Sequence, residues 1–421
     1  MQMTIPEGSQ QKALSHIRIC DFTGQLAGAG ATRTLAAFGA EVIRIEDRLT
    51  EGSWDILRGN GPFVDERRGN ELGGAFNNHN VGKLGISLNM RLPNAKEILT
   101  KLIKISDVVT ENFSAGVLDR WGFSYEEMKK IKPDIIYISN SGFGHYGPYS
   151  SFKTWGPIVQ AVSGITFQSG LPDMPPAGWG FSYMDHTGGY FMAIAILLAI
   201  YHKKRTGEGQ YVDMSCTDAG ASLNGPAMLD YTVNGRPLKR DGSPNSNRSQ
   251  HPLMIPHGIY NCEGVDNWIA IAVRTDQEWR NLCSLMKQDE WLSSQELETK
   301  EGRLKNADQI DKVIGSWALG FNARELMDLL QAAGIPAAKV QKPPERVDQD
   351  ENTAAWGLFP VVEHLEMGRV RVDGVPVKMS QTPPVIEKGA PLLGQHNKYV
   401  LEELLGYTNQ EVQNFYSEGV I

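Results

Sequence analysis

The sequence predicts an α/β fold: a parallel sheet covered by helices, joined to a second and smaller domain. Over the first 150 residues short apolar runs alternate with amphipathic stretches, which is typical of strands that alternate with helices. Residues 225–330 shift towards Asn, Ser and Trp and contain two apolar runs that predict a short sheet. The chain has 421 residues, more than one ordinary hydrophobic core organises. Together these observations predict two domains of unequal size.

The first predicted unit runs from His16 to Glu46. Its segments HIRICDF, GQLAGAGA, TRTLAAFG and EVIRIE predict a strand, a turn, a helix and a parallel strand. Further apolar runs predict strands at 86–90, 108–113 and 134–144, and amphipathic runs predict helices at 94–107 and 125–132. This alternation predicts a parallel sheet that binds its ligand at the carboxyl ends of the strands.

The middle of the chain contains its most apolar stretch, Tyr190–Tyr201, which predicts a buried helix that starts near His186. The stretch is shorter than the roughly 20 residues that span a bilayer, so we expect no membrane segment. The segment TGEGQYVDMS that follows predicts a turn and a strand. We expect a large domain at residues 1–205, completed by about 385–421, a linker at 206–224, a small domain at 225–330 and a return linker at 331–384.

Composition and charge exclude several classes of protein. With 41 Lys and Arg against 49 Asp and Glu, the formal net charge is −8, and the chain lacks the basic excess that nucleic-acid binding requires. None of the four cysteines forms a CxxC pair, which disfavours a disulfide framework or a zinc site and fits a reducing cytoplasm. The first 18 residues lack the apolar core of a signal peptide. We therefore expect a cytoplasmic protein without a bound metal.

The glycine-rich turn at Gly28–Gly30 has two interpretations. With Glu46 sixteen residues later it mimics a dinucleotide fingerprint, in which glycines admit a pyrophosphate and an acid holds the ribose. Arg33 occupies the position of the third glycine, which weakens a nicotinamide site. The alternative is tight packing between a strand and a helix at the start of the sheet.

Polar loops follow two of the predicted strands. Glu111, Asn112 and Phe113 end one strand, and the glycine-rich loop Ser141–Pro148 follows the next. Both loops are candidate ligand contacts, and His145 within the second loop is a candidate of its own.

Asp185 stands between a Gly- and Pro-rich approach and the apolar helix. In one interpretation it caps the helix, since Asp accepts hydrogen bonds from the first free N–H groups. In the other it is a nucleophilic carboxylate, supported by backbone N–H groups near Gly188 and Gly189, whose small size leaves room for an acyl group. His186 is a candidate general base or, more simply, a polar cap residue.

Several strings together resemble the class III CoA-transferases, the family that includes formyl-CoA transferase, carnitine CoA-transferase and the α-methylacyl-CoA racemases. In chain order they are DFTGQLAGAGATRTLAAFGAEVIRIE, GKLGISLNM, DVVTENFSAGVLDRWGF, SGFGHYGPYS, the string around Asp185, TGEGQYVDMS, PHGIYNCEG, AGIPAAKV and PLLGQHNKYVLEELLGY. Their order and spacing carry the resemblance over nearly the whole chain.

The resemblance implies a Rossmann-like large domain, a small domain in the middle of the chain and two intertwined subunits, either identical or homologous. It matches Asp185 to the family's catalytic aspartate. It matches Asn112, Phe113 and Arg120 to positions that contact CoA, with Lys83 and Arg48 as further candidates for the CoA phosphates. No tightly bound cofactor is implied, because the CoA thioester is itself a substrate.

Two departures from the family bear on the reaction. The proton-transferring His of the racemase branch falls on Trp155, and an indole carries no such proton. The active-site Gln of formyl-CoA transferase falls on Leu26, with Gln25 one place away. Epimerisation of an acyl-CoA is therefore the second hypothesis, and a non-catalytic partner subunit of a hetero-oligomeric transferase is the third.

We expect the enzyme to move CoA from an acyl-CoA, with succinyl-CoA as the candidate donor, to a free carboxylic acid. Aromatic residues around Asp185 predict an acceptor more apolar than formate or oxalate, an aryl-substituted or branched acid such as benzylsuccinate. The residues expected in this acceptor pocket are Gln25, Leu26, Phe143, His145, Trp155 and Tyr183, with Trp179 and Phe181 nearby.

Overall fold

The computed structural model describes residues 12–170, 174–180, 182–237, 247–250 and 252–421; Phe181 and the first 11 residues of the chain lie outside this description. The chain divides into two compact units. Unit 1 comprises Met1–Ser169, Ala177–Pro237 and Glu351–Ile421, and unit 2 comprises Gly170–Pro176 and Leu238–Asp350. The main segment of unit 2, Leu238–Asp350, thus lies later in the chain than the small domain expected at 225–330, and the return to the large unit begins at Glu351.

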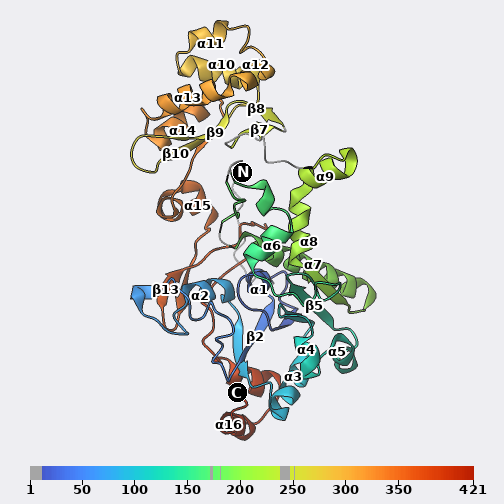
Figure 1. The fold of residues 1–421 in the computed structure, drawn as a ribbon. Coiled ribbons are helices and arrows are strands. Elements are labelled where there is room, and N and C mark those ends of the chain that lie inside the picture. The colour runs from blue at the N-terminus through green and yellow to red at the C-terminus, as the bar shows by residue number, and fades with distance from the viewer. Residues whose placement is uncertain (1–11, 171–173, 181, 238–246, 251) are drawn as a thin grey trace. The chain divides into compact units, whose positions relative to one another are not determined.

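A six-stranded parallel sheet forms the centre of unit 1 (Figure 1). Its strands are β1 (Arg18–Asp21), β2 (Glu41–Asp47), β3 (Leu84–Leu88), β4 (Val108–Glu111), β5 (Ile136–Ser141) and β6 (Tyr211–Ser215). They lie in the order β3-β2-β1-β4-β5-β6, and every neighbouring pair is parallel. This order places a topological switch between β1 and β4, and it confirms the α/β fold and the parallel sheet that the sequence predicts.

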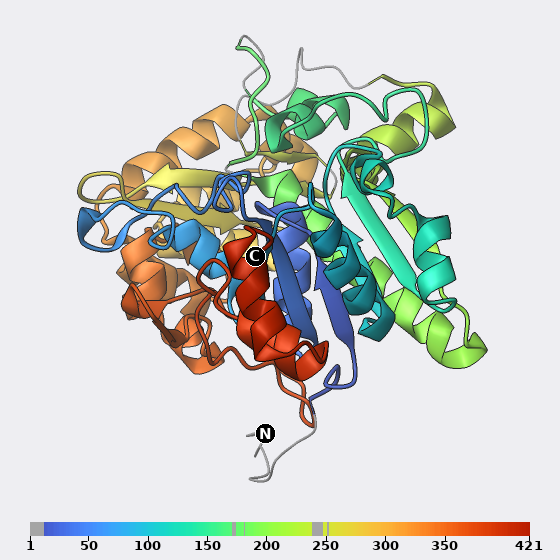
Figure 2. The ribbon, with the colours of Figure 1, turned by 90° about the horizontal axis from the view of Figure 1, so that it is seen from below.

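One face of the sheet is covered by α3 (Pro93–Ile105), α5 (Tyr125–Ile131), η5 (Tyr399–Leu404) and α16 (Asn409–Ser417). In α3 the buried residues Ala95, Ile98, Leu99 and Leu102 recur with the i, i+3, i+4, i+7 spacing of an amphipathic helix. The C-terminal residues join the same core, and Figure 2 shows this last part of the chain beside the first strands.

The other face is covered by α1 (Ala27–Ala37) and α7 (Tyr183–Thr206). Helix α1 begins at Ala27, so most of the turn expected at GQLAGAGA is helical. At Gly28 a Cβ would lie 2.5 Å from the Thr23 Cβ and 2.8 Å from the Asn112 Cγ. Close packing of the helix beside the strand ends therefore accounts for this glycine. This agrees with the second interpretation of the Gly28–Gly30 turn, tight packing between a strand and a helix.

Helix α7 is only half buried, which corrects the prediction of a buried helix. Met192 and Ile196 are fully buried, whereas Tyr190, Ile194, Leu198 and Tyr201 are each more than half exposed. By length and composition alone α7 could cross a membrane. Its buried side nevertheless packs on α1 and the sheet, as a core helix does.

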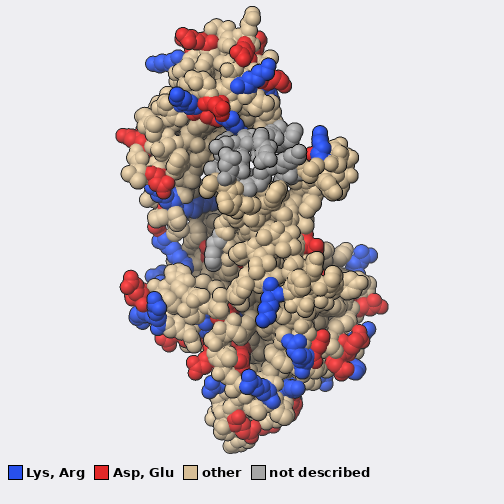
Figure 3. All heavy atoms as spheres, in the orientation of Figure 1, with Lys and Arg blue, Asp and Glu red and all other residues tan. Residues whose placement is uncertain are grey.

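The remaining elements of unit 1 are short. They are η1 (Val64–Glu66), α2 (Gly74–Asn80), α4 (Val117–Trp121), α6 (Gly156–Val162), η2 (Thr166–Gln168), α8 (Cys216–Ala221), η3 (Ser222–Asn224), α9 (Gly225–Asn234), α15 (Glu351–Trp356), β12 (Val361–His364) and β13 (Gly368–Arg371). Where Figure 3 draws unit 1, basic and acidic side chains are interspersed, in line with their similar numbers.

Unit 2 has its own core between a small antiparallel sheet and helices. The sheet has the order β11-β10-β9, from β9 (His257–Asn261), β10 (Trp268–Ala272) and β11 (Ala337–Lys339). The other elements are β7 (Ser249–Gln250), β8 (Leu253–Met254), α10 (Asp276–Leu285), α11 (Asp289–Ser293), α12 (Lys300–Lys305), α13 (Ala307–Ala318), α14 (Ala323–Ala332) and η4 (Glu345–Gln349). Because β11 pairs with β10, the segment GIPAAKV belongs to unit 2, although the sequence placed it in the return linker.

Candidate active site

A cavity of about 270 Å³ lies at the carboxyl edge of the parallel sheet, where β1 and β4 meet at the switch in strand order. The loops after β1, β4 and β5 and the start of α7 form its walls. The residues that line this first cavity are Gln25, Ala27, Trp54, Asn112, Phe113, Ser114, Asn140, Ser141, Gly142, Thr154, Trp155, Gly156, Val159, Met184, Asp185 and Cys216. It therefore lies where open α/β sheets bind their ligands.

Asp185 is the third residue of α7, and its carboxylate lines the first cavity. The cap position belongs to Ser182, so the interpretation of Asp185 as the cap residue is wrong. Burial raises the pKa of Asp185 above its ordinary value, and His186 and the Ser182 hydroxyl only partly oppose this. A carboxylate with few stabilising partners in a cavity has the environment of a nucleophile.

Glycines let the backbone approach this carboxylate closely. A Cβ at Gly156, the first residue of α6, would collide with Asp185 Oδ2. Cβ atoms at Gly188 and Gly189 would lie 2.5 Å from Cys216 Sγ and 2.6 Å from the Ala27 carbonyl oxygen. Both residues lie in the second turn of α7, where backbone N–H groups bond within the helix, and neither lines the first cavity. Their predicted role as oxyanion donors is therefore wrong, and their role is helix packing.

Asn112 and Phe113, both predicted to contact CoA, line the first cavity. The Asn112 side chain accepts the Gly24 N–H at 2.8 Å and donates to the Gly24 carbonyl at 3.0 Å, which ties the loop after β4 to the loop after β1. The Phe113 ring lies 5.0 Å from the Trp54 ring, between centroids. Asn112 thus orders the wall, and the two aromatic rings form part of its surface.

A second cavity of about 280 Å³ adjoins the first, because Trp54 and Phe113 line both. Its lining is mostly apolar and consists of Phe22, Ile45, Glu46, Asp47, Trp54, Leu88, Met90, Phe113 and Trp121. These residues come from β2, β3 and α4 and from the loops after β1, β2, β3 and β4. The two cavities offer a polar and an apolar compartment with a shared aromatic wall.

The three cations predicted to bind CoA phosphates lie in different environments. Arg120 is exposed on α4, and Arg48 is exposed while its Nε donates to the Ile421 carbonyl at 3.2 Å. Lys83 is buried, and its ammonium donates to Asp21 at 3.2 Å, to Asn80 at 2.9 Å and to the Ala29 carbonyl at 3.2 Å. The structure therefore contradicts the prediction for Lys83, because a phosphate could not reach its ammonium without displacing these partners.

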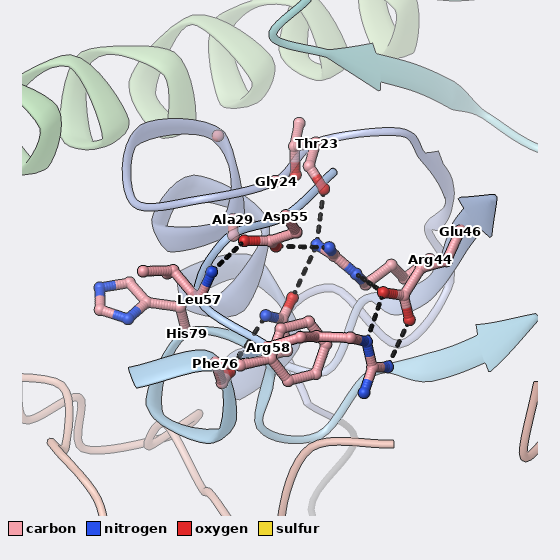
Figure 4. Close-up of polar contacts among 12 residues, drawn as sticks. Thr23, Gly24, Ala29, Arg44, Glu46, Asp55, Leu57, Arg58, Phe76 and His79 are labelled. Atoms are coloured by element: carbon pink, nitrogen blue, oxygen red, sulfur yellow. Dashed lines mark hydrogen bonds and ion pairs between the residues drawn. The ribbon is translucent and has the colours of Figure 1, made fainter. Parts of the chain in front are cut away.

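Sequence reasoning missed a set of buried ion pairs behind the wall, and Figure 4 draws those among Arg44, Asp55, Glu46 and Arg58. Arg44 contacts Asp55 at 2.6 Å, and Arg58 contacts Glu46 at 2.5 Å and Glu71 at 2.7 Å. Apart from Glu71, these side chains are fully buried. With its oxygens engaged by Arg58, Glu46 is not free to hold a ribose, which contradicts the dinucleotide interpretation. The Arg44–Asp55 ion pair fixes the position of Asp55, the residue that follows Trp54 of the shared wall.

The predicted acceptor pocket is only partly assembled. Gln25, with a φ of 56°, and Trp155 line the first cavity. The other four predicted members do not line it. Leu26 packs with Leu57, Phe76 and Ala390, and Phe143 packs with Tyr149 and Phe152. The Tyr183 ring lies 5.3 Å from the Trp179 ring, between centroids, and the His145 ring faces Glu111. Residues of these loops line the first cavity, but sequence spacing does not say which of their side chains point inwards.

His186 does not line the first cavity, which argues against its role as a general base. Its ring lies 5.6 Å from that of His79 and lines a separate small cavity with Arg33 and Asp373. Among the residues that the structure describes, no cluster of three or more His, Cys, Asp or Glu side chains could hold a metal.

Two further residues of the cavity, Asn140 and Cys216, were not predicted. The Cys216 Sγ donates to Asn140 Oδ1 at 3.0 Å, and burial raises the pKa of this thiol to about 12. Both residues lie at the carboxyl ends of strands, β5 and β6, and this position in the pattern was the available signal.

Comparisons with known proteins identify the class. The family described as CoA-transferase family III matches residues 14–397. The chain is 32% identical over 399 residues to the succinate–glutarate CoA-transferase of Agrobacterium fabrum, which covers 94% of this chain and 96% of that protein. It is 31% identical over 425 residues to a formyl-CoA:oxalate CoA-transferase of Rhodopseudomonas palustris, with 97% of each covered.

A solved structure agrees with this match. A CaiB/BaiF family protein from Brucella suis superposes with a TM-score of 0.83 at 28% identity, over 94% of this chain and 100% of that one. The chain therefore belongs to CoA-transferase family III, as the resemblance in its strings implied. It is an enzyme that transfers CoA and takes CoA thioesters as substrates.

Proposed function

We propose that the enzyme moves CoA from an acyl-CoA to a free carboxylic acid through covalent intermediates on Asp185. The observation that carries this proposal is the Asp185 carboxylate, which lies in the first cavity with a raised pKa and against the Cβ-free Gly156. An oxygen of Asp185 attacks the thioester carbonyl, the C–S bond breaks, and an aspartyl anhydride and the CoA thiolate result. The thiolate then attacks the Asp185 carbonyl carbon, the donor acid leaves as its carboxylate, and an aspartyl-CoA thioester remains.

The acceptor reverses these steps. Its carboxylate attacks the aspartyl-CoA thioester and displaces the thiolate, which then attacks the acceptor carbonyl of the new anhydride and restores Asp185. The thioester energy stays in activated acyl groups throughout, provided that water is kept from the cavity.

The two adjoining cavities suit the two ends of CoA. We place the thioester in the first cavity and the adenine in the apolar second cavity, where the Trp121 and Phe113 rings offer stacking surfaces. Arg48 and Arg120 are exposed and each adjoins a residue that lines the second cavity, Asp47 and Trp121 respectively. Both guanidinium groups are thus candidates for the CoA phosphates.

For the substrates we propose succinyl-CoA as donor and an aryl-substituted or branched acid, such as benzylsuccinate, as acceptor. Relatives are named for succinate and glutarate, for succinyl-CoA and mesaconate, and for formyl-CoA and oxalate. Trp54, Phe113 and Trp155 line the first cavity and favour an apolar body on the acceptor. A panel of acids compared by kcat/KM tests this: formate or oxalate as the best acceptor would contradict it.

Epimerisation remains the second candidate and is disfavoured by the cavity lining. Among the described residues that line the first cavity, only Asp185 and Cys216 titrate, and Trp155 occupies the expected place of a proton-carrying His. We expect no rapid deuterium uptake at the α-carbon of a 2-methylacyl-CoA in deuterated water. Rapid uptake without an acceptor acid would favour the racemase.

We further propose that two copies, or two homologous subunits, associate through α7 and α9. Leu198 and Tyr201 on α7 and Leu229, Tyr231 and Val233 on α9 are each about 60% exposed or more in the single chain. Exposed apolar residues in such numbers are typical of an interface. Sedimentation of the purified protein measures the number of subunits.

The covalent role of Asp185 is tested by trapping. Hydroxylamine with succinyl-CoA should convert Asp185 of the wild type to a hydroxamate, found by peptide mass spectrometry. Asp185→Asn should give no adduct and no transfer, whereas Asp218→Asn, the same change at an exposed position of α8, should behave as wild type. An adduct on another residue, or transfer by Asp185→Asn, would overturn the proposal.

A further inference from the structure

His145 does not line the cavity, yet its ring has a defined environment. Its Nε2 is buried, makes no hydrogen bond within the described chain, and lies 3.5 Å from Glu111 Oε1. The ring extends from the loop after β5 to the end of β4. It therefore joins the two loops that form adjacent walls of the first cavity.

Glu111 belongs to the other wall. It ends β4 and is 1% exposed; its Oε2 accepts the Phe113 N–H at 2.6 Å, and its Oε1 accepts the Tyr137 hydroxyl at 3.1 Å. Phe113 lines both cavities. A change in the position of Glu111 is thus transmitted to the shared aromatic wall through one short hydrogen bond.

Asp213 anchors the loop that carries His145. Both of its carboxylate oxygens accept the His145 backbone N–H, at 2.8 and 2.9 Å, and one accepts the Ser139 hydroxyl at 3.2 Å. Gly142, three residues before His145, lines the first cavity. The loop is therefore fixed to β6 on one side and faces Glu111 on the other.

We propose that Glu111 and His145 share one proton that latches the loop after β4 to the loop after β5, with Asp213 as anchor, so that the walls are held in place for acyl-CoA. Neither side chain lines the first cavity, so both act as positioning residues. The inference rests on the proposed function for the place of acyl-CoA.

The charges around Glu111 favour a proton at this contact. The pKa of Glu111 is raised to about 8, chiefly by burial; the Phe113 N–H and the Tyr137 hydroxyl on β5 oppose the rise, while Asp213 on β6 and Asp119 on α4 add to it. Near pH 7 the carboxyl group is mostly protonated and can donate to Nε2. Above about pH 8 it becomes a carboxylate that has no proton to donate to Nε2 and lies near the Asp213 carboxylate, and the latch opens.

Binding of free CoA, measured by calorimetry at pH 7 and at pH 9.5, tests the latch. For the wild type we expect the Kd to rise about five- to tenfold between these values, the effect of about one lost hydrogen bond. Glu111→Gln keeps a donor towards Nε2 at both values and should remove the difference. Glu126→Gln, the same change at an exposed position of α5, controls for lost charge and should follow the wild type.

A second variant approaches the contact from the other loop. His145→Phe cannot accept the proton, so we expect weak binding of CoA at both pH values, near that of the wild type at pH 9.5. The latch is refuted if Glu111→Gln shows the same pH dependence as the wild type, or if His145→Phe binds CoA normally at pH 7. The latch and the proposed chemistry can fail separately. CoA transfer by Asp185→Asn would refute the proposed chemistry, but it would leave these binding results unchanged.

Discussion

Two buried carboxylates end neighbouring strands of the sheet and have opposite electrostatic environments. Asp21 ends β1 and Glu111 ends β4, and both are at most 1% exposed. Burial alone would raise the pKa of Asp21, but Lys83, Arg44 and the Thr23 hydrogen bonds together lower it. The same burial raises the pKa of Glu111 to about 8, because the groups that contact it include no permanent cation. Burial alone therefore does not determine whether a carboxyl group is ionised, because its charged and hydrogen-bonding partners also shift its pKa.

This electrostatic difference distinguishes the carboxylates that stabilise the fold from those at the candidate active site. The pairs of Asp21 with Lys83 and of Arg44 with Asp55 hold strand ends and loops behind the wall, and their charges are compensated. Asp185, in the first cavity, resembles Glu111 because burial raises its pKa. Uncompensated carboxylates lie at and beside the cavity, which is where the proposed chemistry needs them.

The largest expected effect comes from the uncompensated carboxylate of Asp185. Asp185→Asn should lower kcat for CoA transfer by at least about a thousandfold, because it removes the nucleophile. The Tm at pH 7 should stay the same or rise, since a buried carboxylate with a raised pKa disfavours the folded state when it is ionised. Steady-state kinetics and calorimetry check both; a large fall in Tm would place Asp185 among the structural charges.

The compensated pair should respond in the opposite way. Lys83→Met leaves Asp21 without its ammonium partner, and breaking a buried pair costs about 3–5 kcal/mol of stability. Chemical denaturation measures the loss. Lys130→Met, at an exposed pair with Glu127, should change stability by about 1 kcal/mol or less. Similar losses for the two variants would contradict the assignment of Lys83 to the scaffold.

Arg120 sharpens the contrast between buried and exposed cations. Arg120→Ala should weaken CoA binding by about ten- to a hundredfold, which corresponds to a lost charge-assisted contact with phosphate of about 1.5–3 kcal/mol. Its stability should change little, because the side chain is exposed. An unchanged KM for acyl-CoA would remove Arg120 from the site.

Regular patterns made the fold predictable. The apolar runs of β1 to β5 and the amphipathic period of α3 arise from one-sided burial, which sequence records directly. Helix α1 extends into the expected glycine turn, where Gly28 packs against Thr23 and Asn112 beyond the ends of β1 and β4, and no local pattern reports that contact. The exposed face of α7 was not predicted either, because an apolar run alone does not say which of its residues pack on the sheet.

The candidate site was predictable by loop and not by side chain. The strand-end rule pointed to Asn112, Phe113 and the loop after β5, and Asp185 was singled out by its place at the helix start together with its match to the family's aspartate. The burial of Lys83 and the orientation of Phe143 and His145 away from the first cavity depend on contacts between distant segments. The ion pairs of Arg44 and Arg58 were missed because charged residues are expected at the surface.

The last expected effect is a difference in slope that compares Asp21 and Glu111 directly. Asp21, with a lowered pKa in the folded state, contributes stability that is present above its unfolded value of about 3.9 and is lost as the pH falls through the folded value. Glu111, with a pKa raised to about 8, contributes stability that is fully present below its unfolded value of about 4.3 and is lost as the pH rises through about 8. The free energy of unfolding of the wild type should therefore fall between about pH 5 and pH 8 by more than that of Glu111→Gln, whose neutral amide does not titrate. Denaturation at several pH values measures both curves, and parallel curves would mean that Glu111 is ionised in the folded protein and that its environment is compensated after all.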